Sequence, residues 1–302
     1  MTQLLLTGGA GFIGGHFLND YAHKFDRVIV PTRREFVSAK PNVEIIPTDG
    51  TVFSMVNIVK YSQPNVIINC AAAGIKPRDR NWNTLRETNI DLPVALFSTA
   101  QSLGCNTFIQ LSSMAEYSPP PTNRPLKETD NLGAQNFYGQ SKISSSRLLD
   151  KLFSDGRTNL ITLRLFGVFG PGESSHRLTT HIREKIGSGK EVPLSIGTQI
   201  RDFIYIKDVT EAIYMATKKA LQIKGFNHVF NIGSGYGLSV KDFVMAFCDA
   251  GNLDTNQLNF GALPIRDTDI PYLVANIIKA ETFLGWKPRW TLDKALLDYF
   301  ET

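Results

Sequence analysis

The stretch Thr7-Gly8-Gly9-Ala10-Gly11-Phe12-Ile13-Gly14 decides how this chain folds. It follows the short apolar run 3–6, a predicted first strand, and leads into residues 12–24, a predicted helix. In that setting Gly8 permits a tight turn, Gly11 lets the backbone approach a pyrophosphate, and Gly14 lets helix and strand pack closely. The N–H groups and partial positive charge at the helix N-terminus favour phosphate groups. The stretch therefore predicts a dinucleotide site, although its spacing is G-x-x-G-x-x-G rather than G-x-G-x-x-G.

Apolar runs alternate with helix-like segments through the first half of the chain. The runs are continuous, as is typical of parallel strands that are buried on both faces. They cover residues 27–31, 43–47, 65–69, 107–111 and 160–165, and the helix-like segments cover 52–61, 83–103 and 137–153. This alternation predicts an α/β fold with a Rossmann-type, doubly wound parallel sheet. Ligands of such sheets bind at the carboxyl ends of the strands.

Glycine and proline become frequent after residue 170, and the predicted elements become shorter. Helix-like segments cover residues 178–186, 207–220, 239–250, 279–284 and 293–299. We therefore expect a dinucleotide-binding domain over residues 1–170 and a smaller, interleaved C-terminal substrate-binding domain over 171–302. Segments around 201–235 are candidates for returning to the first domain.

The composition of the 302-residue chain limits its partners. The formal net charge is +4 and the basic residues are scattered, so we expect no nucleic-acid partner. Cys70, Cys105 and Cys248 lack the spacing of a metal site, so we expect reduced packing residues and no metal. The sequence shows no secretory signal, and no apolar run approaches the ~20 residues that cross a bilayer. We therefore expect a cytoplasmic protein without a membrane partner.

Tyr138 and Lys142 stand four residues apart on a predicted helix, so their side chains share one face. A phenol has an ordinary pKa of about 10, which an adjacent ammonium lowers. A phenol tuned in this way can exchange a proton with a substrate oxygen. Ser112 and Ser113 follow the predicted strand 107–111, where a hydroxyl can hydrogen-bond the same oxygen. Taken singly, the Tyr–Lys pair could be a chance pairing and the serines a turn or cap.

Together these features resemble the extended short-chain dehydrogenase/reductase family, in the branch that modifies nucleotide sugars. The resemblance covers nearly the whole chain. The matching positions are residues 7–14 (TGxxGxxG), Asp49, residues 69–72 ((N/H)xAA), Asn89, and residues 112–117 (SSxxxY), 138–142 (YxxxK), 163–172 (LRxxNVYGPG), 201–209 (RDF-hydrophobic-YVxDV) and 284–288 (LGWxP). Gly167 replaces the Asn, and Phe169 the Tyr, of the LRxxNVYGPG segment.

The resemblance implies a role for each matching residue. Ser113, Tyr138 and Lys142 would form the catalytic triad, with Ser113 located by counting back from Tyr117. The implied cofactor-binding residues are Thr7, Gly8, Gly11, Phe12, Ile13, Gly14, Thr32, Arg33, Arg34, Asp49, Gly50, Ala71, Ala72, Ala73, Asn89, Tyr138 and Lys142. The implied substrate-binding residues are Ser112, Met114, Phe169, His176, Arg177, Arg201 and Arg266.

The arginines of the substrate set suit a nucleotide diphosphate, because guanidinium groups pair well with phosphate oxygens. Arg201 and Arg266 would make these contacts. Arg266 could instead be a solvated loop residue, and His176 and Arg177 could belong to an exposed loop.

Two departures from the family pattern narrow the reaction. Members that use NAD usually carry an Asp at the end of the second strand, where this chain reads Pro31-Thr32-Arg33-Arg34. Two guanidiniums there favour NADP(H), with NAD(H) still possible. The dehydratases of the family carry Asp-Glu after the catalytic hydroxyl, where this chain has Met114-Ala115. Neither side chain can transfer a proton, so we expect no dehydration.

We therefore predict NADPH-dependent reduction of the C4 ketone of a nucleotide-linked 4-keto-6-deoxyhexose. The alternative is a nucleotide-sugar 4-epimerase with tightly bound NAD. A remote alternative is a cofactor-binding regulator without catalysis, against which the intact triad argues. We also expect a homodimer through helices 83–103 and 137–153, because Leu92, Val94, Leu96, Phe97, Leu148, Leu149 and Leu152 exceed what packing on the sheet requires.

Overall fold

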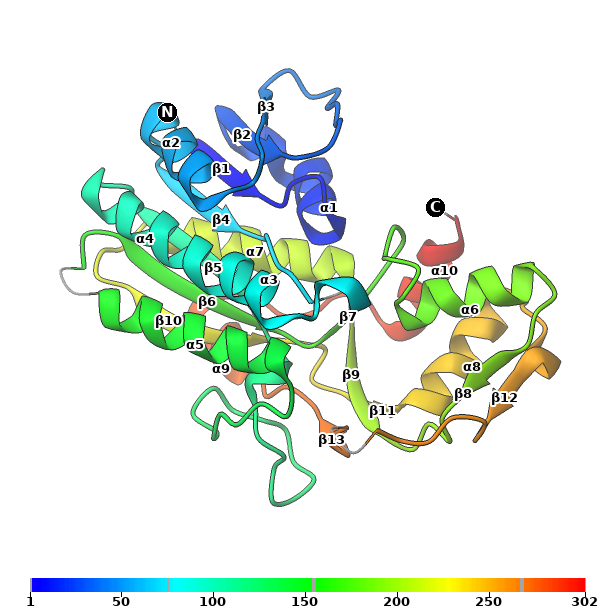
Figure 1. The fold of residues 1–302 in the computed structure, drawn as a ribbon. Helices are drawn as coiled ribbons and strands as arrows, with labels where there is room; N and C mark the ends of the chain where they lie inside the picture. Colours follow the sequence, from blue (N-terminus) through cyan, green and yellow to red (C-terminus); the bar gives the residue numbers. More distant parts are fainter. Residues whose placement is uncertain (1, 75, 154–155, 267–268, 302) are drawn as a thin grey trace.

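A seven-stranded parallel sheet forms the centre of the larger part of the molecule (Figure 1). The computed structural model describes residues 2–74, 76–153, 156–266 and 269–301. The strands are β1 (Gln3–Thr7), β2 (Arg27–Thr32), β3 (Val43–Pro47), β4 (Val66–Asn69), β5 (Thr107–Ser113), β6 (Asn159–Leu165) and β10 (Asn227–Ile232). Their order is β10-β6-β5-β4-β1-β2-β3, and all neighbours are parallel. The predicted α/β, Rossmann-type fold is confirmed.

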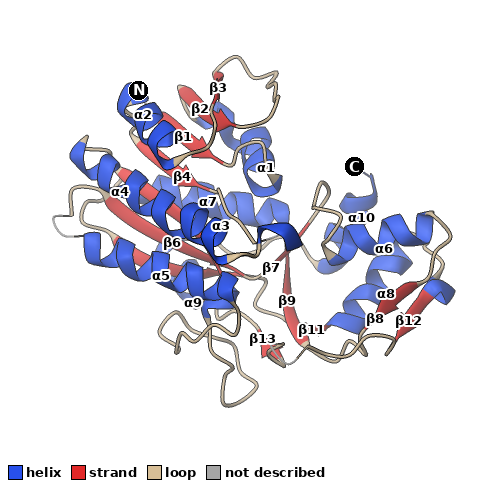
Figure 2. Cartoon of the chain, viewed as in Figure 1, coloured by secondary structure: helices blue, strands red, loops and turns tan. Residues whose placement is uncertain are grey.

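Helices cover both faces of this sheet (Figure 2). Along β1, Leu4 and Leu6 pack into one apolar core and Leu5 into the other, because successive side chains of a strand point to opposite faces. The first core includes α1 (Phe12–Tyr21), α7 (Ile206–Ala220) and α9 (Ile278–Leu284). The second includes α2 (Val52–Ser62), α4 (Leu92–Ser102) and α5 (Phe137–Leu152).

The helix predicted over residues 83–103 is divided into three parts. α3 (Trp82–Arg86) leads into the π-helical turn η3 (Glu87–Asp91), and α4 follows. Pro93 has no N–H to donate to the carbonyl of Asn89, four residues earlier, so the regular hydrogen-bond pattern is interrupted there. This turn places Asn89 in the interior of the molecule.

The C-terminal half contributes a smaller part of the molecule, which lies to the right in Figure 1. One sheet has the order β11-β9-β13, with β7 also paired with β9, and β8 pairs with β12. The bounds of these elements are β7 (Gly167–Phe169), β8 (Val192–Leu194), β9 (Ile200–Tyr205), β11 (Gly237–Ser239), β12 (Leu258–Phe260), β13 (Tyr272–Leu273), α6 (Leu178–Gly187), α8 (Val240–Ala250) and α10 (Leu292–Glu301). Between β9 and β11 the chain returns to the large sheet as α7 and β10, and β10 pairs with β6.

Buried amides connect the strands near their carboxyl ends. The Thr7 hydroxyl donates to Asn69 Oδ1, and Asn69 Nδ2 donates to Gln110 Oε1 at 2.8 Å. This ladder crosses β1, β4 and β5 and fixes the edge of the sheet where ligands of such folds bind. Across the described ranges, no helix has the length and apolar character that crossing a bilayer requires.

Candidate active site

The glycine turn after β1 is tight, and its backbone atoms lie close to one another. Gly8 has φ +66°, and the Gly11 N–H donates to its carbonyl at 2.9 Å. A Cβ on Gly14 would lie 2.3 Å from the Gly8 oxygen, so only glycine fits there. Helix α1 has Gly11 as its N-cap, with no side-chain cap and no acidic residue in its first turn. The arrangement fits the pyrophosphate of a dinucleotide, because the N-terminal N–H groups of a helix bind anions.

The loop after β4 lies against this turn. A Cβ on Gly8 would approach the Cys70 carbonyl carbon to 2.9 Å, and the Ala71 N–H donates to the Thr7 hydroxyl at 3.2 Å. Asn89 accepts from the Ala73 N–H at 2.9 Å and donates to the Ala73 carbonyl at 3.2 Å and to the Ser141 hydroxyl at 2.9 Å. Asn89 is therefore bound on both sides by protein groups and supports the loop Ala71 to Ala73.

Ser113, Tyr138 and Lys142 meet beside this loop. Ser113 ends β5 and hydrogen-bonds the Tyr138 side chain, while Tyr138 and Lys142 lie on α5. Lys142 Nζ donates to the Leu111 carbonyl at 3.1 Å and lies 5.9 Å from the centroid of the Tyr138 ring. A Cβ on Gly139 would lie 2.2 Å from the Ala115 oxygen, so the glycine after Tyr138 allows α5 to approach β5 closely.

Burial dominates the titration of these groups. It raises the pKa of Tyr138, while the Ser113 hydrogen bond and the Arg177 charge lower it. Burial lowers the pKa of Lys142 to about 8, opposed by the charge of Glu116. The nearby cation that lowers the pKa of Tyr138 is Arg177, and the lowering by Lys142, whose ammonium donates to the Leu111 carbonyl, stays a prediction.

The end of β2 presents the two arginines to solvent. The Arg33 side chain packs over Gly50, where a Cβ would lie 2.5 Å from Arg33 Cδ and φ is +78°. Thr32 accepts a hydrogen bond from the Arg34 N–H at 3.1 Å. Asp49 accepts two hydrogen bonds from Thr51, each of 2.9 Å, which hold the pKa of its carboxyl below the usual range. Neither Arg33 nor Arg34 forms an ion pair with another described residue.

The structure contradicts two of the predicted substrate contacts. Ser112 is buried and bonds Glu116, because neighbours in a strand point to opposite faces and Ser113 takes the face of the site. Phe169 is 3% exposed and packs between Tyr205 and Phe243, so it belongs to the core.

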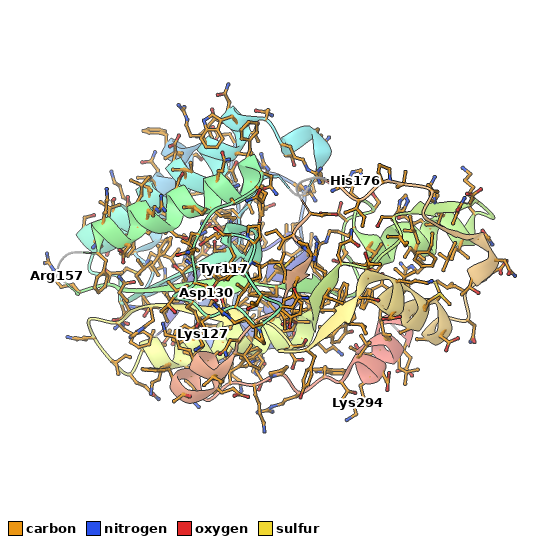
Figure 3. The ribbon with its side chains drawn as sticks, turned by 90° about the horizontal axis from the view of Figure 1, so that it is seen from below. Tyr117, Lys127, Asp130, Arg157, His176 and Lys294 are labelled. Atoms are coloured by element: carbon orange, nitrogen blue, oxygen red, sulfur yellow. The ribbon has the colours of Figure 1, made fainter. Side chains whose placement is uncertain are left out.

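The remaining predicted substrate residues lie on four separate segments of the chain. Met114 is half-buried after Ser113, and His176 is exposed on the segment between β7 and α6 (Figure 3). Arg177 donates to Glu173 at 3.1 Å and to the Val168 carbonyl at 3.0 Å. Arg201 is half-buried on β9, where burial lowers its pKa, and Arg266 is exposed.

Residues 4–233 match the NAD dependent epimerase/dehydratase family. The chain belongs to this family. The predicted membership in the extended short-chain dehydrogenase/reductase family agrees with this match. Among the residues that the structure describes, no cluster of three or more His, Cys, Asp or Glu side chains could hold a metal ion.

Relatives in the family match this chain from end to end. The chain is 28% identical over 315 residues to a UDP-glucose 4-epimerase of Rhizobium leguminosarum bv. trifolii, covering 97% of this chain and 94% of that protein. It is 25% identical over 331 residues to the UDP-glucose 4-epimerase of Bacillus subtilis, covering 98% and 95%. The structure is similar to that of the Thermotoga maritima UDP-glucose 4-epimerase with UDP-glucose, with a TM-score of 0.87, 25% identity and coverage of 99% and 98%.

One buried group near the site was missed at the level of sequence. Glu116 is fully buried and forms an ion pair with Arg164, their atoms Oε2 and Nε lying 2.8 Å apart. Arg164 also donates to the Tyr117 hydroxyl at 3.0 Å, which in turn donates to Asn231 at 2.6 Å. Tyr117 is labelled in Figure 3. The only sequence signal is an acidic residue placed between the strand-end serines and an aromatic residue.

Proposed function

We propose that this protein is a nucleotide-sugar 4-epimerase that works with a tightly bound nicotinamide cofactor. The observation that carries the proposal is the meeting of Ser113, Tyr138 and Lys142 beside the glycine turn. Relatives that span nearly the whole chain are UDP-glucose 4-epimerases, which supports epimerisation over the reduction that the sequence favours.

The residues of the glycine turn would hold the cofactor. Gly8, Gly11 and Gly14 leave room for a pyrophosphate at the N-terminus of α1, and Ala71 to Ala73 border the same space. When bound, a nicotinamide cofactor supplies oxidation and reduction at a sugar carbon.

Tyr138 is the group suited to move the proton of the sugar C4 hydroxyl. Its phenol can take that proton during oxidation and return it during reduction, as a positioned acid–base group. Ser113 already hydrogen-bonds the phenol and can share the same sugar oxygen. Arg177 lowers the pKa of Tyr138, which favours the phenolate required for proton removal.

The substrate we propose is a uridine diphosphate sugar. The Thermotoga maritima epimerase of similar structure was solved with UDP-glucose. In this chain Arg201 is half-buried on β9 and burial lowers its pKa, so an anionic diphosphate would stabilise its charged form. Arg266 lies on the exposed segment beyond β12 and is the second candidate for this contact.

The test is to incubate the purified protein with UDP-glucose and to measure UDP-galactose formation. We expect conversion without added reductant and without net oxidation or reduction of nicotinamide. Stoichiometric oxidation of NADPH with a nucleotide 4-keto-6-deoxyhexose, together with no interconversion of UDP-hexoses, would show that the protein is a reductase instead.

That second candidate, an NADPH-dependent 4-ketoreductase, is favoured by one specific observation. The chain has Thr32-Arg33-Arg34 after β2, and Arg33 lies across Gly50 with its guanidinium exposed. Two guanidiniums at this strand end suit the 2′-phosphate of NADP(H). The dehydratase reaction has no such support, because Met114 and Ala115 carry no group that transfers protons.

We also propose a homodimer, although fewer residues support it than the sequence indicated. The argument from α4 is wrong for Leu92, Leu96 and Phe97, which are buried against the rest of the same chain. Leu149 of α5 is buried in the same way. The large apolar side chains that remain exposed on or beside these helices include Trp82, Leu103, Phe137 and Leu148, at 41%, 38%, 58% and 41%.

We expect light scattering at micromolar concentration to give twice the chain mass of 33.6 kDa. The substitution Leu148→Lys should shift the protein toward the monomer, because it places a charge in the apolar interface. Tyr61→Lys is the matched control, since Tyr61 is a 77% exposed aromatic residue on α2. A wild-type monomer, or equal effects of the two substitutions, would contradict the proposed dimer.

A further inference from the structure

Glu116 lies on the turn η4 (Met114–Glu116), which follows Ser113 directly, and its carboxylate is fully buried. One oxygen accepts hydrogen bonds from the hydroxyls of Ser112 and Ser146, the second at 2.9 Å. The other oxygen accepts from Arg164 Nε at 2.8 Å, and the Arg164 side chain is 5% exposed. Both oxygens are therefore held by protein groups, of which Ser112 and Arg164 are buried and Ser146 is half-buried.

These contacts join the three elements around the proposed catalytic groups. Ser112 precedes Ser113 on β5, and Arg164 on β6 is its direct partner in the sheet. Ser146 follows Lys142 by four residues on α5, just as Lys142 follows Tyr138, so all three share one helix face. The carboxylate of Glu116 thus binds the strand that carries Ser113 to the face of α5 that carries Tyr138 and Lys142.

The charges around this face come from four directions. Glu116 faces Lys142 and Tyr138 from η4, and its charge raises the pKa of both. Arg177, before α6, lowers the pKa of Tyr138. The Cys70 thiol after β4 faces Lys142, but burial raises its pKa to about 12. Arg164 pairs with Glu116 from β6 and donates through Nη1 to the Tyr117 hydroxyl and the Glu128 carbonyl.

We propose that Glu116 is a positioning residue of this site, which fixes β5 against α5 and places a negative charge beside the Lys142 ammonium. Without that charge, Lys142 would lose its proton at lower pH. Burial already brings the pKa of Lys142 to about 8, so the change would fall close to neutral pH. Only the kinetic part of the test rests on the proposed epimerase function.

The variant that tests this is Glu116→Gln, which removes the charge and keeps the shape. The amide oxygen can accept from Arg164, and the amide nitrogen can donate to the two serine hydroxyls, which accept as well as donate. Glu128→Gln is the matched control. Glu128 accepts from the Asn231 N–H at 2.9 Å and raises the pKa of Lys279 rather than that of Lys142.

The lysine titrations are followed by NMR of 13Cε-labelled lysine with saturating NAD, with Lys142→Arg used for assignment. We expect Glu116→Gln to lower the Lys142 midpoint by at least about 0.5 pH unit and to leave Lys279 unchanged. Glu128→Gln should lower the Lys279 midpoint and leave the Lys142 midpoint unchanged. With UDP-glucose, Glu116→Gln should lower kcat about tenfold with little change in KM, and its alkaline limb should move to lower pH.

An unchanged Lys142 titration in a folded Glu116→Gln protein would overturn the proposal. If that variant does not fold, Glu116→Gln/Arg164→Gln removes both buried charges, and a smaller lowering of the Lys142 midpoint is expected because the opposing Arg164 charge is removed as well. A Lys142 midpoint at its wild-type value in the double variant would overturn it equally. A wild-type protein that is inactive toward UDP-glucose would contradict the epimerase function, while the titrations would still decide the role of Glu116.

Discussion

Tyr138→Phe is expected to fold normally, to bind cofactor and to lose turnover by about 10²–10⁴-fold, the usual contribution of a positioned acid–base group. The ring packs against Gly74, where a Cβ would lie 2.8 Å from Tyr138 Cδ2, and phenylalanine keeps this contact. Only the hydroxyl that Ser113 bonds is removed. The measurement is kcat for interconversion of UDP-hexoses, together with the melting temperature and the bound nicotinamide.

Tyr61→Phe serves as the control, because it removes a phenol that is exposed on α2. Its rate should equal that of the wild type. A Tyr138→Phe enzyme within threefold of the wild-type rate would remove Tyr138 from the mechanism. A loss of bound cofactor in that variant would show that the hydroxyl serves binding rather than proton transfer.

Arg33→Ala/Arg34→Ala is expected to lower the preference for NADPH over NADH at least tenfold. A guanidinium that pairs with a 2′-phosphate contributes about 1.5–3 kcal/mol, the range of hydrogen bonds to charged groups, which is about 10- to 150-fold in affinity. NADH lacks this phosphate, so its binding should change little. Titration of both cofactors into the wild type and the double variant measures the effect.

Lys218→Ala/Lys219→Ala is the matched control, because it removes the same charge at the end of α7, away from β2. It should leave the preference unchanged. If the wild type already prefers NAD(H), or if the arginine variant keeps its preference, Arg33 and Arg34 are surface residues. The reductase candidate would then lose its support, and the epimerase would remain.

The sequence predicted the central sheet well because its strands are continuous apolar runs. The run predicted at 27–31 is β2 (Arg27–Thr32), and the one at 160–165 is β6 (Asn159–Leu165). The glycine turn could also be predicted from the sequence, because its requirements are local. Gly8 needs a positive φ, and Gly14 has no room for a Cβ. The resemblance to the family predicted that Ser113, Tyr138 and Lys142 lie together.

The errors arose where the surroundings of a residue depend on distant parts of the chain. Phe169 was assigned to the substrate site through its place in the family's LRxxNVYGPG segment, yet Phe243 of α8 packs against it. Glu116 gave no local sign of burial, because its partner Arg164 lies 48 residues further along. The split of the helix at 83–103 follows from Pro93, whose effect on the carbonyl of Asn89 could have been anticipated.

The return of the chain to the large sheet limits how this enzyme can be engineered. A fragment that stopped after residue 170 would lack β10, so the edge of β6 would be open to pairing with other chains. It would also lack α7, whose Val209, Ile213 and Ala216 are fully buried. The C-terminal half therefore cannot be exchanged between relatives as one continuous segment. Chimeras need at least two crossover points, one on each side of the segment that contains α7 and β10.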